Sequence, residues 1–574
     1  MALVIPKGGR KRKPIGTLDD LIAFLGSNKT LVAKRRRDLI SACNSTARLV
    51  GRPPSDIPAN IAALRDLFAK LHPVQCRISK KRLANIRADL AAALELAGII
   101  PADSRDTTPL PAWTEFLDHA TAKHHAWLLS RFARFCSQRQ IEPANVDDAV
   151  VREFRTWLDV RVLTNDPKKI VKDTATAFNA IIKRAGLDIS LLTTALSERH
   201  LARRLDTYPA SLGEDIERYL KRLREPDLFS GEGPRRPLRP TSLRNIEAHI
   251  RQTLDAAVAT GYSPEHFKGL ADLVEIGVIK AAINHMVERR DGKTPSGLGN
   301  ILATLLAIAR HYVKAPAETI EGLETATKKL GKRGDTREAR LSAKNERRLE
   351  QFDIARNRDL LIDLPHKLMA RANKRPGGRQ SAMDAMIAAA IAVLLACPLR
   401  MATLSALNLI EDMTIIEECR TREYLVHIAA EKVKNRQEIA AIIAGPQATV
   451  LTRYIKHHRK FLSQTPGDWL FPAVSGGPRI PDHFGSLIKD KIFRETGLVV
   501  HPHLIRHFAA RTLLEANPGD YETPRKLLGH ASQKMVTTVY APLASRAAFQ
   551  RYSEILNGKK GSKNKAGRND EPRK

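Results

Sequence analysis

Apolar residues recur with helical spacing along nearly every long segment of this chain. Leu21, Ile22 and Leu25 are an early example, and the pattern returns at 61–71. Spacings of i, i+3 and i+4 place side chains on one face of an α-helix. The chain has 574 residues, which is too many for one hydrophobic core. We therefore expect several helical domains.

Two short apolar runs interrupt this pattern, at 424–428 and 438–443. They flank the polar segment 431–437, and such an arrangement is typical of a β-hairpin. A strongly apolar helix is predicted before them, at 382–395. The predicted fold class is mainly α with a small β-hairpin or sheet (α+β) in the C-terminal part.

The chain is strongly basic, with a net charge of +33. A protein with this much self-repulsion usually has a polyanionic partner, most often nucleic acid. Charge alone does not separate DNA from RNA, and a ribosome-associated or merely basic protein is the alternative. The segment 558–574 is rich in Lys, Arg, Gly and Asn and is predicted to be a basic disordered tail.

Cysteine usage and apolar runs indicate the compartment. The five cysteines are scattered without the paired spacing of a zinc site, which favours a reducing compartment without disulfides. The most apolar run, 387–396, is too short to span a bilayer, and no apolar signal core follows the basic N-terminus. We expect a soluble, cytoplasmic protein with no membrane partner.

Three stretches before residue 330 share a weak common plan, at 36–98, 124–186 and 242–310. Each has an amphipathic helix, a turn containing Pro, a second helix, and a helix rich in Ala or Leu. Repeats of a DNA-grasping module would explain them, although any three helical bundles look similar at this level. Segments 101–111 and 231–240 are predicted linkers, and 327–348 is a basic connector or a solvated linker.

These observations predict five regions along the chain. The expected boundaries are an N-terminal helical domain at 1–105, a second helical domain at 106–230, a third helical domain at 231–335, a C-terminal domain at 336–556, and the tail at 557–574.

The sharpest chemical pattern lies at 501–511. Pro502 suits the first turn of a helix, so His503 and Arg506 would share one face. His507 would lie nearby. A guanidinium beside an imidazole provides charge stabilisation and proton transfer for a phosphodiester under attack. Alone, such a pair is more often a surface ion-pair element.

A second pattern follows at 526–542. Leu527 and Leu528 are predicted core residues, Gly529 is predicted to end a helix, and His530 is then presented from its cap. Tyr540 would lie on a short helix that ends before a proline. Taken singly, a tyrosine in this setting usually packs in a core.

The order of these residues along the chain resembles the tyrosine recombinase (phage integrase) family. That family's pattern is an arginine after a hydrophobic residue, a hairpin lysine, His-x-Leu-Arg-His, Leu-Gly-His and a tyrosine. The matching residues here are Arg400, Lys432 or Lys434, His503 with Arg506 and His507, His530, and Tyr540. The resemblance covers about 340–556.

Three departures from the family pattern bear on catalytic efficiency. Thr403 stands where the family usually has Glu, which helps to hold the basic groups. Cys397 and Pro398 replace a small residue and Gly before the arginine. The interval from His530 to Tyr540 is slightly longer than is typical.

The resemblance implies an integrase-like catalytic domain at 336–556, with helical DNA-binding domains before it. Of these, 231–335 would be a core-binding domain and 106–230 would resemble one. Tyr540 would be the nucleophile, and Arg400 and Arg506 would clamp the phosphate. His503 would assist proton transfer and His530 would donate to the phosphate. Lys432 is the favoured general acid, and Lys434 the alternative. Covalent catalysis of this kind needs no cofactor and no metal.

The implied function is DNA recombination, as an integrase or transposase of a mobile element in a bacterial cytoplasm. Double-stranded DNA is the implied partner, bound by a homotetramer, with or without partner recombinases. The alternatives are a DNA-relaxing enzyme of the type IB topoisomerase kind and a catalytically idle DNA-binding protein of the same fold. Phe549, Tyr552 and Leu556 share one predicted helix face, which would dock on a neighbouring subunit or on its own domain.

Overall fold

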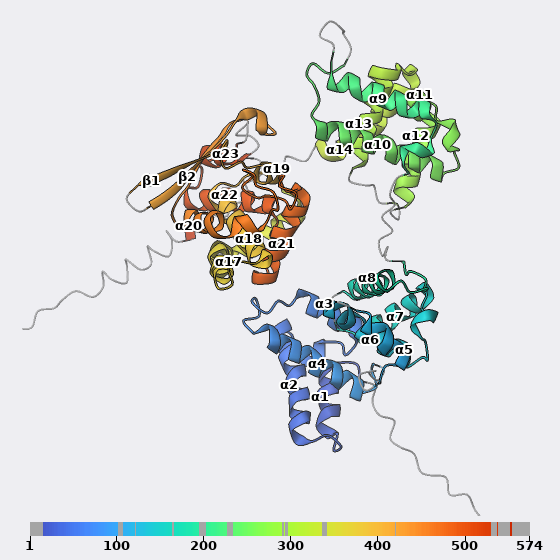
Figure 1. Ribbon diagram of the computed structural model, residues 1–574, viewed down its shortest axis with the longest axis vertical. Coiled ribbons are helices and arrows are strands. Elements are labelled where there is room, and N and C mark those ends of the chain that lie inside the picture. The colour runs from blue at the N-terminus through green and yellow to red at the C-terminus, as the bar shows by residue number, and fades with distance from the viewer. Residues whose placement is uncertain are drawn as a thin grey trace, which may run out of the picture. The chain divides into compact units, whose positions relative to one another are not determined.

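The computed structural model describes residues 15–100, 107–120, 122–163, 166–193, 203–226, 233–289, 292, 297–335, 341–418, 421–529, 536–537 and 552–553. It divides into two compact units, Met1–Ser197 with Leu341–Lys574, and Glu198–Arg340. The described residues are mainly helical with one three-stranded antiparallel sheet (Figure 1), which confirms the predicted fold class.

The first helical core contains α1 (Leu18–Ser27), α2 (Ala33–Val50), α3 (Ile61–Lys70) and α4 (Lys80–Leu96). Helix α1 begins at a capping box, in which Thr17 accepts from the backbone of Asp20 and the Asp20 carboxylate accepts from the backbone of Thr17. Leu64 and Phe68, on the predicted apolar face, are fully buried.

The second helical core contains α5 (Pro111–Asp118), α6 (Lys123–Ser137), α7 (Asp148–Arg161) and α8 (Pro167–Ala185). Aromatic rings fill it: Trp113 lies edge-on to Phe132, with ring centroids 5.7 Å apart, and Phe116 stacks on Phe178. The Trp113 indole donates to the carbonyl of Ile141 at 2.8 Å, so its one polar atom is satisfied.

The third core lies in the second unit. It contains α9 (Ala210–Arg224), α10 (Pro240–Ala259), α11 (Leu270–Leu273), α12 (Ile276–Glu288), α13 (Leu298–Ile308) and α14 (Ala317–Asp335). A five-residue π-helix, Ala309–Val313, extends α13. Leu212 and Ile216 of α9 are buried in the same cluster as Leu254 of α10. The predicted boundary between residues 230 and 231 therefore falls within one hydrophobic core.

The same turn follows the second helix of each of these cores. It begins at a residue with positive φ, has a proline three residues later that opens a 3₁₀ turn, and ends at a buried apolar residue three further on. The positive-φ residues are Gly51, Gln140 and Gly261. The prolines are Pro54, Pro143 and Pro264. The apolar residues are Ile57, Val146 and Phe267.

The hydrogen bonding of these turns also agrees. In each turn, the backbone N–H that follows the positive-φ residue bonds to the carbonyl five residues back, as in a Schellman motif. The pairs are Arg52 to Ala47 at 3.2 Å, Ile141 to Cys136 at 3.0 Å, and Tyr262 to Ala257 at 3.4 Å. The three stretches therefore share one helix–turn–helix plan in their backbone as well as in their sequence.

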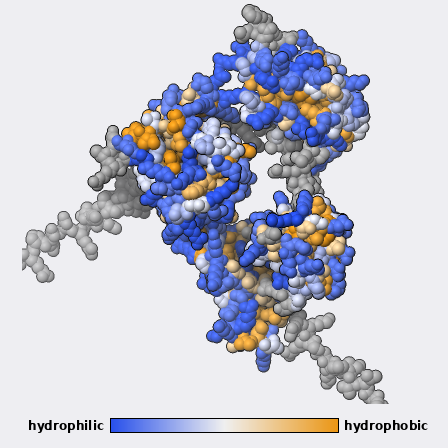
Figure 2. Space-filling view, viewed as in Figure 1, coloured by the Kyte–Doolittle hydropathy of each residue, from blue (hydrophilic) through white to orange (hydrophobic). Residues whose placement is uncertain are grey.

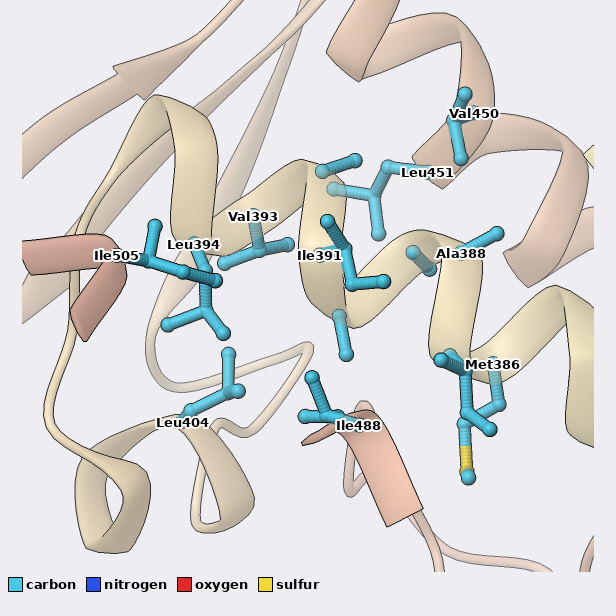
Figure 3. Close-up of a cluster of buried hydrophobic side chains, with 14 of the residues drawn as sticks. Met386, Ala388, Ile391, Val393, Leu394, Leu404, Val450, Leu451, Ile488 and Ile505 are labelled. Carbon is cyan, nitrogen blue, oxygen red and sulfur yellow. The ribbon is translucent and has the colours of Figure 1, made fainter. Parts of the chain in front are cut away.

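The C-terminal region is built around one buried helix, α18 (Arg379–Ala396), which confirms the helix predicted at 382–395. Side chains from the surrounding helices pack against it, among them Leu404, Leu451, Ile488 and Ile505 (Figure 3). The helices of this region are α15 (Ala343–Glu350), α16 (Ala355–Ile362), α17 (Leu364–Asn373), α19 (Met401–Ser405), α20 (Gly445–Arg453), α21 (Pro481–Thr496), α22 (Pro502–Ala516) and α23 (Glu522–Leu528).

Helix α18 is the one described helix that is long and apolar enough to cross a membrane by length and composition. Most of it is buried: Ala388, Ala389, Ala390 and Ile391 have no exposed surface. An all-round apolar helix is expected at the centre of a large core. Figure 2 shows that hydrophilic residues predominate on the displayed face of the protein.

The sheet has strand order β1 (Met413–Glu418), β2 (Thr421–Ile428), β3 (Ile439–Ile443). Strands β2 and β3 pair antiparallel with Val426 opposite Ala441, which confirms the predicted hairpin. Strand β1 was not predicted. It is an edge strand, and its Ile415 is exposed, so its sequence lacks a clear buried face.

Candidate active site

Helix α22 positions the sharpest sequence pattern. The His501 imidazole caps the helix, because its Nδ1 accepts from the backbone N–H of Leu504 at 3.1 Å. Pro502 occupies the first turn, as predicted. Burial is the largest cause that lowers the pKa of His501, to about 4, and nearby cations such as Arg348 add to it. His501 is thus neutral and able to act as an acceptor.

Arg506, one turn after the start of α22, is 4% exposed. Its guanidinium donates to the carbonyl of Pro398 and, at 2.6 Å, to the carbonyl of Leu528. Pro398 lies two residues before Arg400, and Leu528 is the last residue of α23. One buried arginine therefore ties together the segments that carry two other predicted site residues.

Arg400 lies at the N-terminal cap position of α19. Its Nη1 donates to the Oδ1 of Asn435, in the turn between β2 and β3, at 3.3 Å. Burial lowers the pKa of the Arg400 guanidinium below its usual range. The Asn435 side chain also donates to the carbonyl of Gly529. Arg506 and Asn435 thus bind the neighbouring carbonyls of Leu528 and Gly529.

His503 lies one turn before Arg506 on α22. Its pKa is lowered below 6.5, first by desolvation and then by the positive charges of Arg506 and Arg400. The ring of His507 lies perpendicular to it, with centroids 4.8 Å apart. Three predicted site residues from two distant segments therefore meet in one positively charged site, which would favour a bound phosphate over water.

Comparison with known proteins bears on this arrangement. Residues 365–546, less than half of the chain, match the phage integrase family. These residues form a phage integrase domain. The match includes all six predicted site residues and confirms the resemblance seen in the sequence. The match of these residues to the family supports a role in DNA recombination.

Solved structures give weaker likenesses. A XerA recombinase is 16% identical with a TM-score of 0.25, covering 54% of this chain and 98% of the XerA chain. XerH bound to its difH substrate is 14% identical with a TM-score of 0.30, covering 59% and 94%. A lambda integrase dimer bound to a COC′ core site is 14% identical with a TM-score of 0.31, covering 57% and 94%. No curated protein matches the sequence. Values this low do not identify a function.

The two candidate lysines of the phage integrase domain differ in their surroundings. The Lys432 ammonium binds the carboxylates of Asp412, at 2.7 Å, and Glu411, at 2.6 Å. Hydrogen bonds to Asp412 and then to Glu411 raise its pKa above 10.5. Lys434 is exposed, and within the described part of the chain it has no ion pair or side-chain hydrogen bond.

The remaining predicted site residues follow helix α23 in the sequence. Helix α23 ends at Leu528, and Gly529 follows with φ +56, which confirms the predicted helix end. Leu528 is buried as predicted, whereas Leu527 is exposed, so its assignment to the core was wrong. His530 and Tyr540 lie outside the described residues, as do Phe549 and Leu556 of the predicted docking face.

Sequence reasoning missed Asn435, the described partner of Arg400. Thr403, which stands where the family pattern has Glu, is buried in α19, three residues after Arg400. The lack of a carboxylate at residue 403 was the available signal that another acceptor must hold Arg400. Among the residues that the structure describes, no group of three or more His, Cys, Asp or Glu side chains is arranged to hold a metal ion.

Proposed function

We propose that this protein is a site-specific DNA recombinase of the integrase or transposase type, which cleaves and rejoins strands through a 3′-phosphotyrosine intermediate. The observation that carries the proposal is the meeting of Arg400, His503 and Arg506 in one positive site within the phage integrase domain. The adjacent Gly529 leads directly into His530.

In the proposed reaction, the phenolic oxygen of Tyr540 attacks a scissile phosphorus and the bond to the 5′ oxygen breaks. Arg400 and Arg506 stabilise the charge that builds on the non-bridging oxygens. His503, neutral because its pKa is lowered, accepts the phenolic proton, and His530 donates to the phosphate. A 5′ hydroxyl of a partner strand then attacks the adduct and releases the tyrosine, so the phosphodiester energy is conserved.

The departing 5′ oxygen needs a proton, and a hairpin lysine is the proposed donor. Sequence alone favours Lys432. Its two ion pairs would have to break before it could reach a phosphate, whereas Lys434 has no such restraint among the described contacts. The ion pairs therefore support Lys434 as the acid and assign Lys432 a role in holding the hairpin.

The rest of the chain is proposed to bind and organise DNA. We propose domain boundaries near residues 105 and 197, with a third helical domain at about 198–340 and the catalytic domain after it. The active assembly would be a tetramer on two double-stranded DNA sites. A mobile element and a bacterial cytoplasm are the proposed setting.

A trapping experiment tests the proposal. DNA that flanks the coding sequence is made with a nick next to each possible cleavage site, so that the short fragment carrying the released 5′ hydroxyl diffuses away and the adduct accumulates. We expect a covalent protein–DNA species that resists denaturation and is lost in Tyr540→Phe. Tyr521→Phe, at a tyrosine just before α23, is the matched control and should form it normally.

The outcomes separate the alternatives. An adduct that persists in Tyr540→Phe would refute the assigned nucleophile. Relaxation of supercoiled DNA without exchange of strands between duplexes would instead indicate a topoisomerase. DNA binding without any adduct on the full set of flanking substrates would indicate an idle DNA-binding protein.

A further inference from the structure

Helices α6 and α8 of the second helical core are unusually basic. Together they carry eight Lys or Arg residues and a single acidic residue, Asp173. The other two helices of the same core, α5 and α7, carry three basic and five acidic residues. Positive charge is therefore concentrated on two of the four helices, outside the matched domain at 365–546.

The two basic helices lie against each other. Phe132 of α6 and Phe178 of α8 both contact the ring of Trp113. Burial is the largest cause that lowers the pKa of His125, followed by the charges of His124 and Arg184. Because Arg184 must lie close to His125 to have this effect, the end of α8 lies near the start of α6. We call the solvent-exposed part of these two helices the α6–α8 face. Its exposed residues include Lys123, His124, Trp127, Lys169, Lys172 and Arg184.

An exposed tryptophan lies within this charged surface. The Trp127 side chain is 78% exposed, whereas Trp113 of the same core is fully buried. Lys123 and His124 precede it by four and three residues, so they share its side of α6. Within the described ranges, the Trp127 ring has no aromatic or cation–π partner. A large apolar ring left in water among cations is suited to a partner that is both anionic and aromatic.

The helix ends add to the positive potential. The N-terminus of a helix carries partial positive charge and is usually stabilised by acidic residues. The first turn of α6 instead holds Lys123, His124 and His125, and no side chain caps it. The first turn of α8 holds Lys168 and Lys169, and the Asp166 carboxylate caps it by accepting from the backbone N–H of Lys169. These cations repel the helix dipole, and a bound polyanion would relieve that repulsion.

We propose that the α6–α8 face is a DNA-binding surface separate from the candidate active site, in which the basic side chains bind phosphates and the Trp127 ring packs against a base or a sugar. The proposal rests on the proposed function for its choice of DNA. The positive charge of this face complements the negative charge of the DNA phosphate backbone, which supports the proposal. A membrane surface would require further apolar residues beside Trp127, but Leu129 and Phe132 point into the core.

Salt dependence of binding tests the electrostatic part. The full chain is titrated with an unnicked duplex of about 40 base pairs and with a single strand of that length, at several salt concentrations. Lys169→Gln/Lys172→Gln/Arg184→Gln should reduce the slope of log K against log salt by about 2 to 3. Lys172→Gln should reduce it by about 1, and the matched control Arg152→Gln, an exposed cation of α7, should not change it.

Substitution of the ring tests the role of Trp127. Trp127→Ala should weaken binding by about five- to 100-fold, and Trp127→Phe should restore most of the affinity because it keeps an aromatic face. Val160→Ala removes an exposed apolar side chain from α7 of the same core and should leave Kd unchanged. A larger effect on the single strand indicates base stacking, and an equal effect on both probes indicates packing in a groove of the duplex.

Circular dichroism of each variant verifies folding. The proposal would be overturned if the triple variant and Trp127→Ala are both folded and bind DNA with the Kd and the salt slope of the wild type. Unchanged DNA binding with lost binding to anionic phospholipid vesicles would also overturn it and assign the face to a membrane. Adduct formation at Tyr540 is measured separately. If the adduct is absent but the variants still weaken DNA binding, only the recombinase assignment fails. If the adduct forms but the variants bind DNA normally, only the proposed surface fails.

Discussion

At the scale of single residues, the candidate site depends on side chains that hold other side chains. Asn435 accepts from Arg400 and donates to the carbonyl of Gly529, so one amide joins the hairpin, α19 and the end of α23. An amide can do both because it has a donor and an acceptor, whereas a carboxylate can only accept. This dual role explains how the site is held together although residue 403 is Thr.

We predict that Asn435→Ala lowers the rate of adduct formation by about tenfold, because a hydrogen bond to a charged group is lost. DNA affinity should stay near the wild-type value, since Asn435 contacts protein groups. Thr403→Glu should restore part of the rate in the Asn435→Ala background by supplying an acceptor beside Arg400. Single-turnover kinetics measure both effects. A rate unchanged by Asn435→Ala would contradict the positioning role.

Substitution of Lys432 and of Lys434 should have different effects on the free energy of unfolding. Asp412 has a side chain that is 3% exposed, so Lys432→Ala leaves a buried carboxylate without its cation. We expect a loss of about 1 to 3 kcal/mol in the free energy of unfolding, reduced from the fully buried case because Lys432 itself is half-exposed. Lys434→Ala should leave stability unchanged.

Chemistry separates the lysines independently. Sulfur in place of the departing 5′ oxygen needs no protonation, so a substrate with this replacement should restore cleavage in the variant that lacks the general acid. We expect rescue of Lys434→Ala. Rescue of Lys432→Ala alone would return the role to Lys432.

At the scale of elements, sequence periodicity predicted the helices and the β2–β3 hairpin, because both bury a regular apolar face. Strand β1 escaped prediction because an edge strand with an exposed Ile415 buries little. For the site, spacing within α22 predicted that His503 and Arg506 share a face. Contacts between distant segments, such as Arg506 with Pro398, depend on tertiary packing and have no local signature.

The cap of α22 should make stability depend on pH. His501 has a pKa of about 4 in the folded protein against 6.5 ordinarily, so the unfolded chain binds its proton first as pH falls. The contribution of His501 to the free energy of unfolding is fully present above about pH 6.5. It is lost as the pH falls toward 4, by roughly 2 to 3 kcal/mol in total. His501→Asn keeps a cap that does not titrate and should remove this part of the pH dependence.

Thermal unfolding of both proteins at pH 7.5 and about pH 4.5 measures the difference. His457→Asn, at an exposed histidine of the same domain, is the control and should follow the wild type. Equal losses in the wild type and His501→Asn would show that His501 does not carry the effect.

The repeated turn makes its own prediction, because one of its three copies lacks glycine. Gln140 has φ +56, whereas Gly51 and Gly261 fill the same place elsewhere. Gln140→Gly should raise the free energy of unfolding by about 0.5 to 1 kcal/mol, and Gly51→Ala should lower it by about 1 to 2 kcal/mol. Gly26→Ala, within α1 and without a close neighbour, should stabilise slightly. Urea denaturation measures all three, and a destabilising Gln140→Gly would refute the shared turn.

At the scale of the whole molecule, residues 198–340 form a unit with their own hydrophobic core. A core of this size is typical of a domain that folds alone. We predict that a fragment of these residues unfolds cooperatively in urea. Leu254→Ala, at a fully buried position, should lower its stability by about 2 to 5 kcal/mol.

In the full chain, the same substitution should leave the unfolding of the other unit unchanged, and that comparison decides whether the units are energetically independent. All four tryptophans lie in the other unit, so their fluorescence reports on it alone. Hydrogen exchange reports on residues 198–340. Each measurement gives a loss in the free energy of unfolding for its own unit. If Leu254→Ala causes equal losses in both units, the two units unfold together and the catalytic domain depends on the third core for its stability.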